Sequence, residues 1–337
     1  MERFKVFLPK LLKMIILPIV VYILFFVICR LAGADKFGIG TDLMAIFRNT
    51  ILTGMIALAV SYNLTSGRFD FSVGATLILS TILGGGLALR FGLDAVSMLL
   101  LCMLFGVILG ALGGLVYVML RLPPMVVSLG VAMVYEAVGF IITNSTGISI
   151  IGKTNLMIWA KEPYIYIFCI IITLILYILL NKTRFGYNTN SLRKGQEIAV
   201  NTGINEKTNT VICYAIAGAL LASAGVISMS ILGTMAPALG LSSISYIQNA
   251  FLPMFIGNIL AKYGDRNTGV IMGSLTQAII ISAFGALSIP PSWQNIMNGM
   301  IVIVFFAYSY NSYRIVEFQM FERKRIHAEK AAGLETK

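Results

Sequence analysis

Charged side chains are scarce in this sequence. Only 12% of its 337 residues are Asp, Glu, Lys or Arg, and 58% are hydrophobic, whereas soluble domains have about 25% charged and about 45–50% apolar residues. This number of charged side chains is too small to cover the surface of a soluble fold of this size. Most of the exterior must therefore face lipid. The sequence therefore predicts an all-α, polytopic membrane protein.

Side chains that serve catalysis and metal binding are few as well. The one histidine is His327, and Cys29, Cys102, Cys169 and Cys213 lie in separate apolar runs. This spacing forms neither a disulfide framework nor a metal site, and no acids are paired at helical spacing for acid–base work. We expect no catalytic residue, no metal and no cofactor in this chain.

The sequence also has no GxxxxGK[ST] run, the loop that holds nucleotide phosphates. The chain therefore cannot supply an ATPase of its own. Its net charge of +11 does not indicate nucleic acid, because the basic residues gather in a few loops between apolar stretches, which is typical of membrane proteins.

Ten apolar stretches approach the length of about 20 residues that a membrane-spanning helix needs. They are roughly 14–32, 47–64, 71–90, 95–120, 125–143, 163–181, 209–232, 247–261, 268–287 and 294–311. With the N-terminus inside, the outside segments hold few basic residues, namely Arg30, Lys36, Arg48, Arg90, Lys153 and Lys161. We therefore expect both termini in the cytoplasm, one transmembrane domain over 1–313 and a charged cytoplasmic tail over 314–337.

The N-terminal stretch has two interpretations. Basic residues precede the apolar run 14–29, and Ala32-Gly33-Ala34 resembles a cleavage site, which is the layout of a secretory signal peptide. Because many further spans follow, we favour an uncleaved first helix.

A polar break follows the second stretch. Its apolar part, 51–64, would form about 21 Å of helix, short of the ~30 Å hydrocarbon core, and Ser66-Gly67-Arg68-Phe69-Asp70 comes next. Broken helices favour transport sites, because their freed backbone groups can face a cavity. The break is either part of a solute path, with Asn63, Asp70 and Ser72 as candidates, or a cytoplasmic turn in which Asp70 caps a helix that starts at Phe71.

Two further polar positions lie inside expected spans. An ionisable residue within a span is costly and is a functional candidate, so Glu136 is expected to pair with Arg68, to bind solute hydroxyls or to be protonated. The eighth stretch is short and contains Pro253, Gly257 and Asn258. It is the second candidate for a broken helix that lines a path, with Asn258 as its polar group.

Small residues in the fourth stretch recur every fourth position, at Gly106, Gly110 and Gly114. Such spacing lets two helices approach closely. The partner helix lies either in a second subunit or in the same chain, and we favour the same chain.

The longest polar run is 181–208, which contains a short apolar patch at Ile198, Ala199, Val200 and Ile204. A polar loop with one small apolar face is either a solvated connection or a docking element for a cytosolic partner. Composition alone favours the connection.

Several segments carry a family resemblance. They are Thr183-Arg184-Phe185-Gly186, Gly195-Gln196-Glu197-Ile198-Ala199, Asn201-Thr202-Gly203-Ile204, Asp70-Phe71-Ser72-Val73-Gly74 and Leu122-Pro123-Pro124-Met125-Val126-Val127-Ser128-Leu129-Gly130. In order and spacing, over roughly 45–310, they resemble the ribose-type permeases, the membrane subunits of ATP-binding-cassette sugar importers. The resemblance implies that the loop 182–208 carries a coupling helix that sits in a groove of an ATP-binding subunit. Its expected coupling residues are Gly195, Glu197, Ala199, Asn201, Gly203 and Ile204.

The resemblance also implies an assembly. It would contain two permease subunits, identical or paralogous, around one pathway, with two ATP-binding subunits that hold the ATP. An extracytoplasmic binding protein would deliver the solute, and the outside loop Asn144–Lys161 offers it a docking surface. The expected location is a bacterial inner membrane, and the expected solute is a sugar or a similar small polar molecule.

The chain departs from its relatives at two positions. They usually have Gly-Gly-Ile/Leu-Asp-Leu-Ser where this chain has Ser66-Gly67-Arg68-Phe69-Asp70-Phe71-Ser72, and often a basic residue at position 136. Two alternatives stay open. One is a branched-chain amino acid or nucleoside permease of the same fold. The other is an ion-coupled secondary transporter, which would use the carboxylates of Asp70 and Glu136.

Overall fold

The structure is a computed structural model. It describes residues 2–64, 68–261, 263–290 and 292–300, together with 303, 304, 307 and 311. The chain divides into two compact units, Met1–Pro290 and Pro291–Lys337. The first unit carries the architecture below. In the second, residues 292–300 are helical, and the expected tail 314–337 lies outside the described residues.

Eight helices of the first unit are long and apolar enough to cross a membrane, by length and composition, within the described residues. This confirms the expected helical membrane fold. The helices that contain these spans are α1 Glu2–Leu31, α2 Gly40–Leu64, α3 Val73–Phe91, α4 Ala95–Leu120, α5 Pro124–Ile142, α6 Tyr164–Lys182, α9 Glu206–Leu232 and α11 Arg266–Ala286.

The remaining elements are short. They are β1 Ile148–Ser149, η1 Leu156–Ala160, α7 Arg184–Lys194, α8 Gln196–Asn201, β2 Thr234–Met235, η2 Ser242–Ile244 and α10 Ser245–Leu260. The expected eighth span is α10, whose 16 residues give about 24 Å of helix, less than the ~30 Å hydrocarbon core. The expected tenth span, 294–311, is described in part, over 294–300 and at positions 303, 304, 307 and 311, all of them helical.

The loop Asn144–Lys161, which the sequence places outside, is held by contacts at both of its ends. Its strand β1 pairs antiparallel with β2, with Ile148 opposite Met235, so the fold has one small sheet besides its helices. At the other end of the loop, the indole Nε1 of Trp159 donates a 2.9 Å hydrogen bond to the carbonyl of Ala95. The loop is therefore held against α4 and the end of α9.

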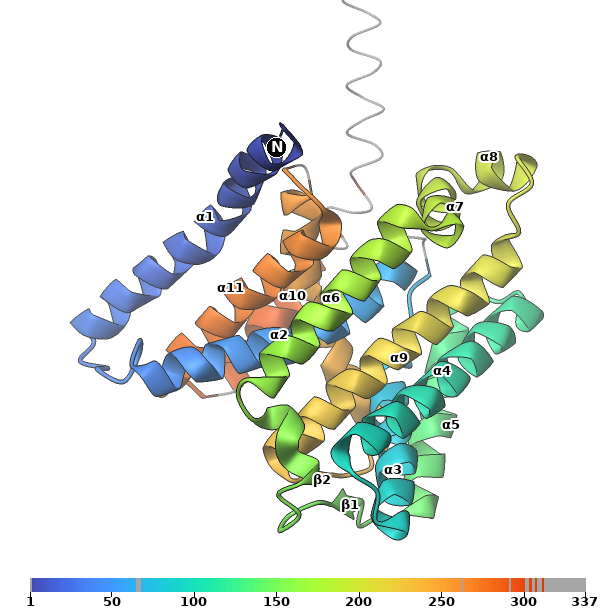
Figure 1. Ribbon diagram of the computed structural model, residues 1–337, viewed down its shortest axis with the longest axis horizontal. Coiled ribbons are helices and arrows are strands. Elements are labelled where there is room, and N and C mark those ends of the chain that lie inside the picture. The colour runs from blue at the N-terminus through green and yellow to red at the C-terminus, as the bar shows by residue number, and fades with distance from the viewer. Residues whose placement is uncertain are drawn as a thin grey trace, which may run out of the picture. The chain divides into compact units, whose positions relative to one another are not determined.

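Helices α4 and α9 form the closest pair in the bundle. A Cβ on Gly218 of α9 would lie 2.0 Å from the carbonyl oxygen of Gly106, and one on Gly110 would lie 2.2 Å from the carbonyl oxygen of Tyr214. Only hydrogen fits between these backbones. The glycine spacing of the fourth stretch therefore serves packing within the chain, as expected, and Figure 1 shows the two helices side by side.

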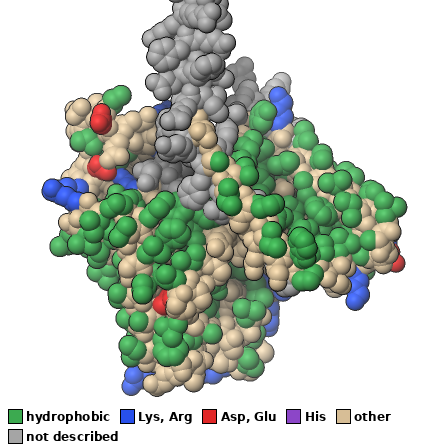
Figure 2. All heavy atoms as spheres, turned by 180° about the vertical axis from the view of Figure 1, so that it is seen from behind, with side chains coloured by type: hydrophobic (Ala, Val, Ile, Leu, Met, Phe, Trp, Pro, Cys, Tyr) green, Lys and Arg blue, Asp and Glu red, His purple; other side chains and the backbone are tan. Residues whose placement is uncertain are grey.

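The two ends of the first unit carry different elements. Figure 1 shows the N-terminal end of α1 at the same, upper end of the unit as α7 and α8, on the opposite side, and β1 and β2 at the lower end. This arrangement agrees with the expected topology, in which the N-terminus and the polar run 181–208 share a side. Figure 2 shows hydrophobic side chains over most of the face it presents, as a lipid-facing exterior requires.

Candidate functional site

The two interrupted stretches meet in space. Phe69, in the break between α2 and α3, stacks on Phe251 of α10 with ring centroids 5.6 Å apart. A Cβ on Gly74 would lie 2.0 Å from the carbonyl oxygen of Ser243, so glycine lets the start of α3 touch the loop before α10. The sequence indicated each break separately, and the structure brings them together.

Asp70 and Ser72 form a closed local pair at this junction. Asp70 Oδ1 accepts hydrogen bonds from the backbone N–H of Ser72 at 2.8 Å and from its hydroxyl at 2.6 Å, and both side chains are buried. Helix α3 begins at Val73 with Ser72 at the N-cap position, two residues later than the expected start at Phe71. Burial raises the pKa of the Asp70 carboxyl, and the two bonds from Ser72 oppose that rise.

Asn63 has the opposite environment. Its side chain is 1% exposed, yet neither its amide nitrogen nor its amide oxygen has a hydrogen-bond partner among the described residues. Its backbone carbonyl accepts the N–H of Arg68 at 3.0 Å. Because an unpaired buried amide costs free energy, Asn63 is the group in this junction best suited to bind a polar ligand.

Glu136 holds the loop that leads into α10. Its Oε2 accepts the N–H of Leu241 at 2.8 Å and its Oε1 accepts the N–H of Ser243 at 3.0 Å. Leu241 has φ +64°, a strained conformation for a side-chain-bearing residue, which these bonds help to hold. The buried carboxylate thus has a backbone partner that the sequence did not reveal.

Arg68 pairs with Glu206, so the pairing with Arg68, one of the three alternatives for Glu136, is wrong. The Arg68 side chain is 3% exposed, and its Nη2 lies 3.5 Å from Glu206 Oε1. The same oxygen accepts a 2.8 Å hydrogen bond from Gln196 Nε2. Since arginine stays charged when buried, it needs this acid. Sequence reasoning missed Glu206, although an acid in the first turn of α9 was the available signal.

These contacts form a chain of polar groups, the Gln196–Glu206–Arg68 link. Gln196 begins α8, Glu206 begins α9, and Arg68 lies in the break before α3. The link therefore connects the surface segment α7–α8 to the junction of the two interrupted stretches.

Helix α8 presents part of the predicted apolar patch outward. Ile198 is 73% exposed and Val200 is 43% exposed, whereas Ala199 is 4% exposed and faces the protein. Glu197 and Asn201 are exposed on the same short helix. The apolar patch is thus divided: Ala199 packs against the protein, and Ile198 and Val200 face outward.

Gly203 ends α8 in a conformation that requires glycine. It has φ +91°, its N–H donates to the carbonyl of Val200 at 2.9 Å, and the N–H of Ile204 donates to that of Ala199 at 3.2 Å. This pattern of bonds is the Schellman motif. Gly195, between α7 and α8, is extended with φ −180°, which any residue can adopt.

Asn258 lies apart from this junction. Its Oδ1 accepts hydrogen bonds from the Nε of Arg266, at 3.1 Å, and from its Nη2. It is seven residues along α10 from Phe251, which contacts Phe69, about 10 Å at 1.5 Å per residue. The structure therefore brings Asp70, Ser72 and Glu136 to one junction and leaves Asn258 near the α10–α11 turn.

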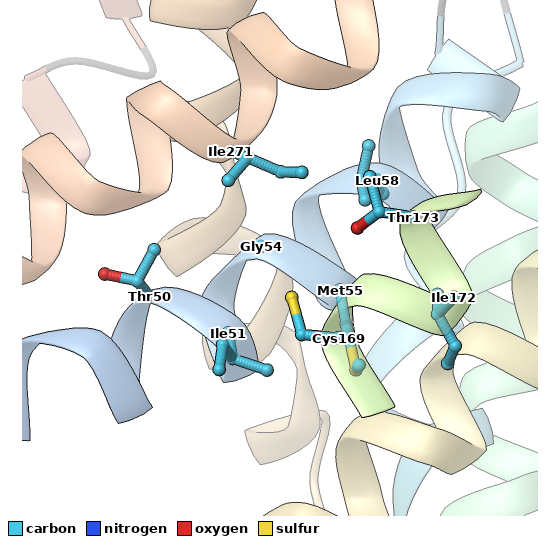
Figure 3. Close-up of a pocket in the computed structure, with 9 residues that line it drawn as sticks. All are labelled: Thr50, Ile51, Gly54, Met55, Leu58, Cys169, Ile172, Thr173 and Ile271. Carbon is cyan, nitrogen blue, oxygen red and sulfur yellow. The ribbon is translucent and has the colours of Figure 1, made fainter. Parts of the chain in front are cut away.

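A small cavity lies between α2, α6 and α11 (Figure 3). Its volume is about 40 Å³ and its walls include Gly54, Met55, Cys169 and Ile271. A water molecule occupies roughly 30 Å³ in the liquid, so this cavity is too small for an organic solute. Among the described residues, no three His, Cys, Asp or Glu side chains are grouped to hold a metal ion.

Comparisons with known proteins match most of the chain. A family model described as "Branched-chain amino acid transport system / permease component" matches residues 42–306. A fructose import permease of Rhizobium meliloti is 23% identical over 85% of this chain and 82% of its own. A ribose import permease of Bacillus subtilis is 26% identical over 78% and 83%, and an L-arabinose transport permease of Escherichia coli is 24% identical over 88% and 92%. No solved structure matches.

Proposed function

The chain belongs to the family of branched-chain amino acid transport system permease components, and from this premise we propose that it forms the pathway of an ATP-driven bacterial importer for a monosaccharide or a similar small polar solute. As a permease component it is a transport subunit and not an enzyme. The single observation that carries the solute class is that its relatives named for fructose, ribose and arabinose align with 78–88% of the chain.

The proposed assembly pairs this chain with a second permease subunit, identical or paralogous. ATP would be bound by two separate ATP-binding subunits, because this sequence has no phosphate-binding loop. An extracytoplasmic binding protein would dock on the loop Asn144–Lys161, whose fixation by β1 and Trp159 gives it a defined surface.

The proposed docking element for the ATP-binding subunit is α8. An isolated six-residue helix is unstable in water, but here the buried Ala199 and the Gly203 cap hold it in place. The side chain of Ile198 is then exposed beside the exposed Glu197. An exposed apolar anchor with a charged neighbour is typical of a protein contact.

We propose that movement of α8 reaches the pathway through the Gln196–Glu206–Arg68 link. The link ends at the break before α3, which touches α10 through Phe69 and Phe251. Closure of the ATP-binding subunits would thus be transmitted to both interrupted stretches. The shift is limited by how much more tightly the partner binds one state than the other.

The proposed solute contacts lie at the same junction. Asn63 has unpaired amide groups that suit sugar hydroxyls. Asp70 and Ser72 bond to each other in the break before α3, and Glu136 holds the loop before α10. Asn258, near the α10–α11 turn, is a candidate contact outside the junction.

The carboxylates of Asp70 and Glu136 do not support the alternative of an ion-coupled secondary transporter. Glu136 already accepts two backbone N–H groups and Asp70 already accepts two bonds from Ser72. An ion site requires several oxygen ligands in one place, whereas both oxygens of Glu136 and Oδ1 of Asp70 already accept hydrogen bonds within the protein.

Co-purification from gently solubilised native membranes tests the docking proposal. The tagged wild-type chain should bring down a subunit with ATPase activity, and Ile198→Asp should lose it. Ile151→Asp is the matched control, because Ile151 is similarly exposed at 69% but lies in the loop at the opposite end. If the chain is recovered without an ATPase, or if both variants retain it equally, the proposed docking element is wrong.

A further inference from the structure

An apolar groove lies between α4, α6 and α9. Its volume is about 270 Å³, and its walls include Val107 of α4, Leu176 and Leu179 of α6, and Ala215, Ile216 and Ala219 of α9. Val107 is 38% exposed, so the groove opens toward the surroundings of the bundle. The lining offers a hydrocarbon chain contact and offers a polar solute no hydrogen bond.

The groove continues toward α7. A second, smaller cavity shares Leu179 and Ile216 with the first, and its other walls include Phe185 and Thr189 of α7. The lining on α6 extends from Ile172 to Leu179, and three residues later comes Lys182. Ten residues of helix rise about 15 Å, which is half of the ~30 Å hydrocarbon core. The groove and the basic residue beyond its end therefore together span about the depth of one lipid leaflet.

Basic side chains surround the α7 end of the groove. Lys182 follows Leu179 by three residues and Arg193 follows Thr189 by four, so each lies on the same helix face as a lining residue. Arg184 adjoins Phe185, and all three cations are exposed. No Asp or Glu occurs from 163 to 196. In the part of the chain that the structure describes, none of the three forms an ion pair.

The surroundings of Arg193 show the same shortage of negative charge. Desolvation lowers the pKa of its guanidinium, because the protein covers part of the group without supplying an anion. An external anion would remove this imbalance. Arginine binds phosphate with two parallel hydrogen bonds, which makes a phosphate group the best match.

We propose that this groove binds an anionic phospholipid of the cytoplasmic leaflet, with one acyl chain between α4, α6 and α9 and its phosphate against Lys182, Arg184 and Arg193. A depth of about one leaflet with cations at the α7 end fits a lipid better than a helix of another protein, which would span both leaflets. Basic pockets between transmembrane helices on the cytoplasmic side bind acidic headgroups in other proteins. The site adjoins α8, so an occupied groove would hold α6 and α7 in a fixed position beside the coupling segment.

Lipid retention measures this site directly. The full chain is reconstituted in nanodiscs of mixed phosphatidylcholine and phosphatidylglycerol, and released protein is weighed by native mass spectrometry. The wild type should retain phosphatidylglycerol. The triple variant Lys182→Gln, Arg184→Gln, Arg193→Gln should lower the affinity about 100-fold, since each cation near a headgroup contributes about fivefold.

Two comparisons distinguish a specific lipid site from general attraction of anionic lipid to a basic surface. In the first, three exposed cations at the opposite end are changed together, Arg90→Gln, Lys153→Gln and Lys161→Gln, and phosphatidylglycerol should stay bound. In the second comparison, Ala219→Phe fills the groove and should expel the lipid. Ile170→Phe, at a position 66% exposed on another face of α6, should not.

Three results would overturn the proposal. Equal retention of phosphatidylcholine would exclude an anionic headgroup. Loss of lipid in both triple variants, or retention in Ala219→Phe, would indicate diffuse attraction to the surface. A bound polypeptide mass in place of a lipid mass would show that the groove is a protein contact. Because transport is not measured, none of these results depends on the proposed importer function.

Discussion

The carboxylate of Glu136 shows how one residue can be costly in a membrane helix and still be structural. Its two hydrogen bonds go to backbone N–H groups of the loop before α10. Hydrogen bonds to a charged group contribute about 1.5–3 kcal/mol each. These two bonds therefore stabilise the position of the loop that leads into α10.

Replacement of Glu136 tests this role. Glu136→Ala should lower the free energy of unfolding by about 3 kcal/mol, because it leaves two buried donors unpaired. Glu136→Gln keeps one acceptor oxygen and should lose about half as much. Thermal unfolding in detergent measures both. A Glu136→Ala protein with unchanged stability but no transport would show instead that Glu136 contacts the solute.

Gly203 provides a second test at single-residue scale. Gly203→Ala should place a Cβ in the left-handed region, at a cost of about 1–2 kcal/mol, and should loosen the end of α8. Hydrogen exchange over residues 196–204 should then rise about tenfold. Gly195→Ala is the control, because Gly195 is extended and its nearest atom to a new Cβ is 3.6 Å away. Equal exchange in the two variants would contradict the cap.

At the scale of elements, the α4–α9 contact sets how tightly the bundle closes. Gly218→Ala would push a methyl group to within 2.0 Å of the Gly106 carbonyl. The helices would have to separate, and we expect a loss of about 2 kcal/mol, as for overpacked cores.

The matched control for this contact is Gly130→Ala on α5, where a Cβ meets nothing within 4 Å. It should be neutral or slightly stabilising, since alanine favours helix more than glycine does. Thermal unfolding of both variants under the same conditions measures the difference in their stability. A stable Gly218→Ala protein would mean that the two backbones are farther apart than described.

The Gln196–Glu206–Arg68 link makes a prediction about coupling. Gln196→Ala removes a 2.8 Å bond to a carboxylate and leaves the Arg68–Glu206 pair in place. In the reconstituted complex, ATP hydrolysis should continue while the solute moved per ATP falls, by up to about tenfold if the bond contributes about 1.5 kcal/mol. Ser191→Ala, at an exposed position on α7, is the control. An unchanged ratio for Gln196→Ala would remove the link from the mechanism.

The sequence predicted elements better than it predicted contacts between them. Apolar stretches located α1 to α6, because hydropathy depends on local composition, and the glycine period indicated close packing. The partners of Glu136 and Arg68 could not be predicted, since they lie 105 and 138 residues away along the chain and depend on how the helices pack. Helix α3 was placed two residues early, since it begins at Val73 with Ser72, not Asp70, at the N-cap position.

At the scale of the whole molecule, the two interrupted stretches and the α7–α8 segment form one connected system inside a lipid-facing bundle. Composition predicted that bundle, because few charged residues are available to cover it. The family match spans all three parts, over residues 42–306. The central claim is therefore that ATP hydrolysis by a partner moves a small polar solute through this chain.

Uptake into proteoliposomes tests that claim most directly. The chain is reconstituted with its ATP-binding subunits and its binding protein, and labelled ribose, fructose and arabinose are offered outside with ATP supplied to the ATP-binding side. We predict uptake of at least one sugar that requires ATP hydrolysis and is unaffected by a protonophore. Uptake that proceeds without ATP, follows a proton gradient and is abolished by the protonophore would contradict the account.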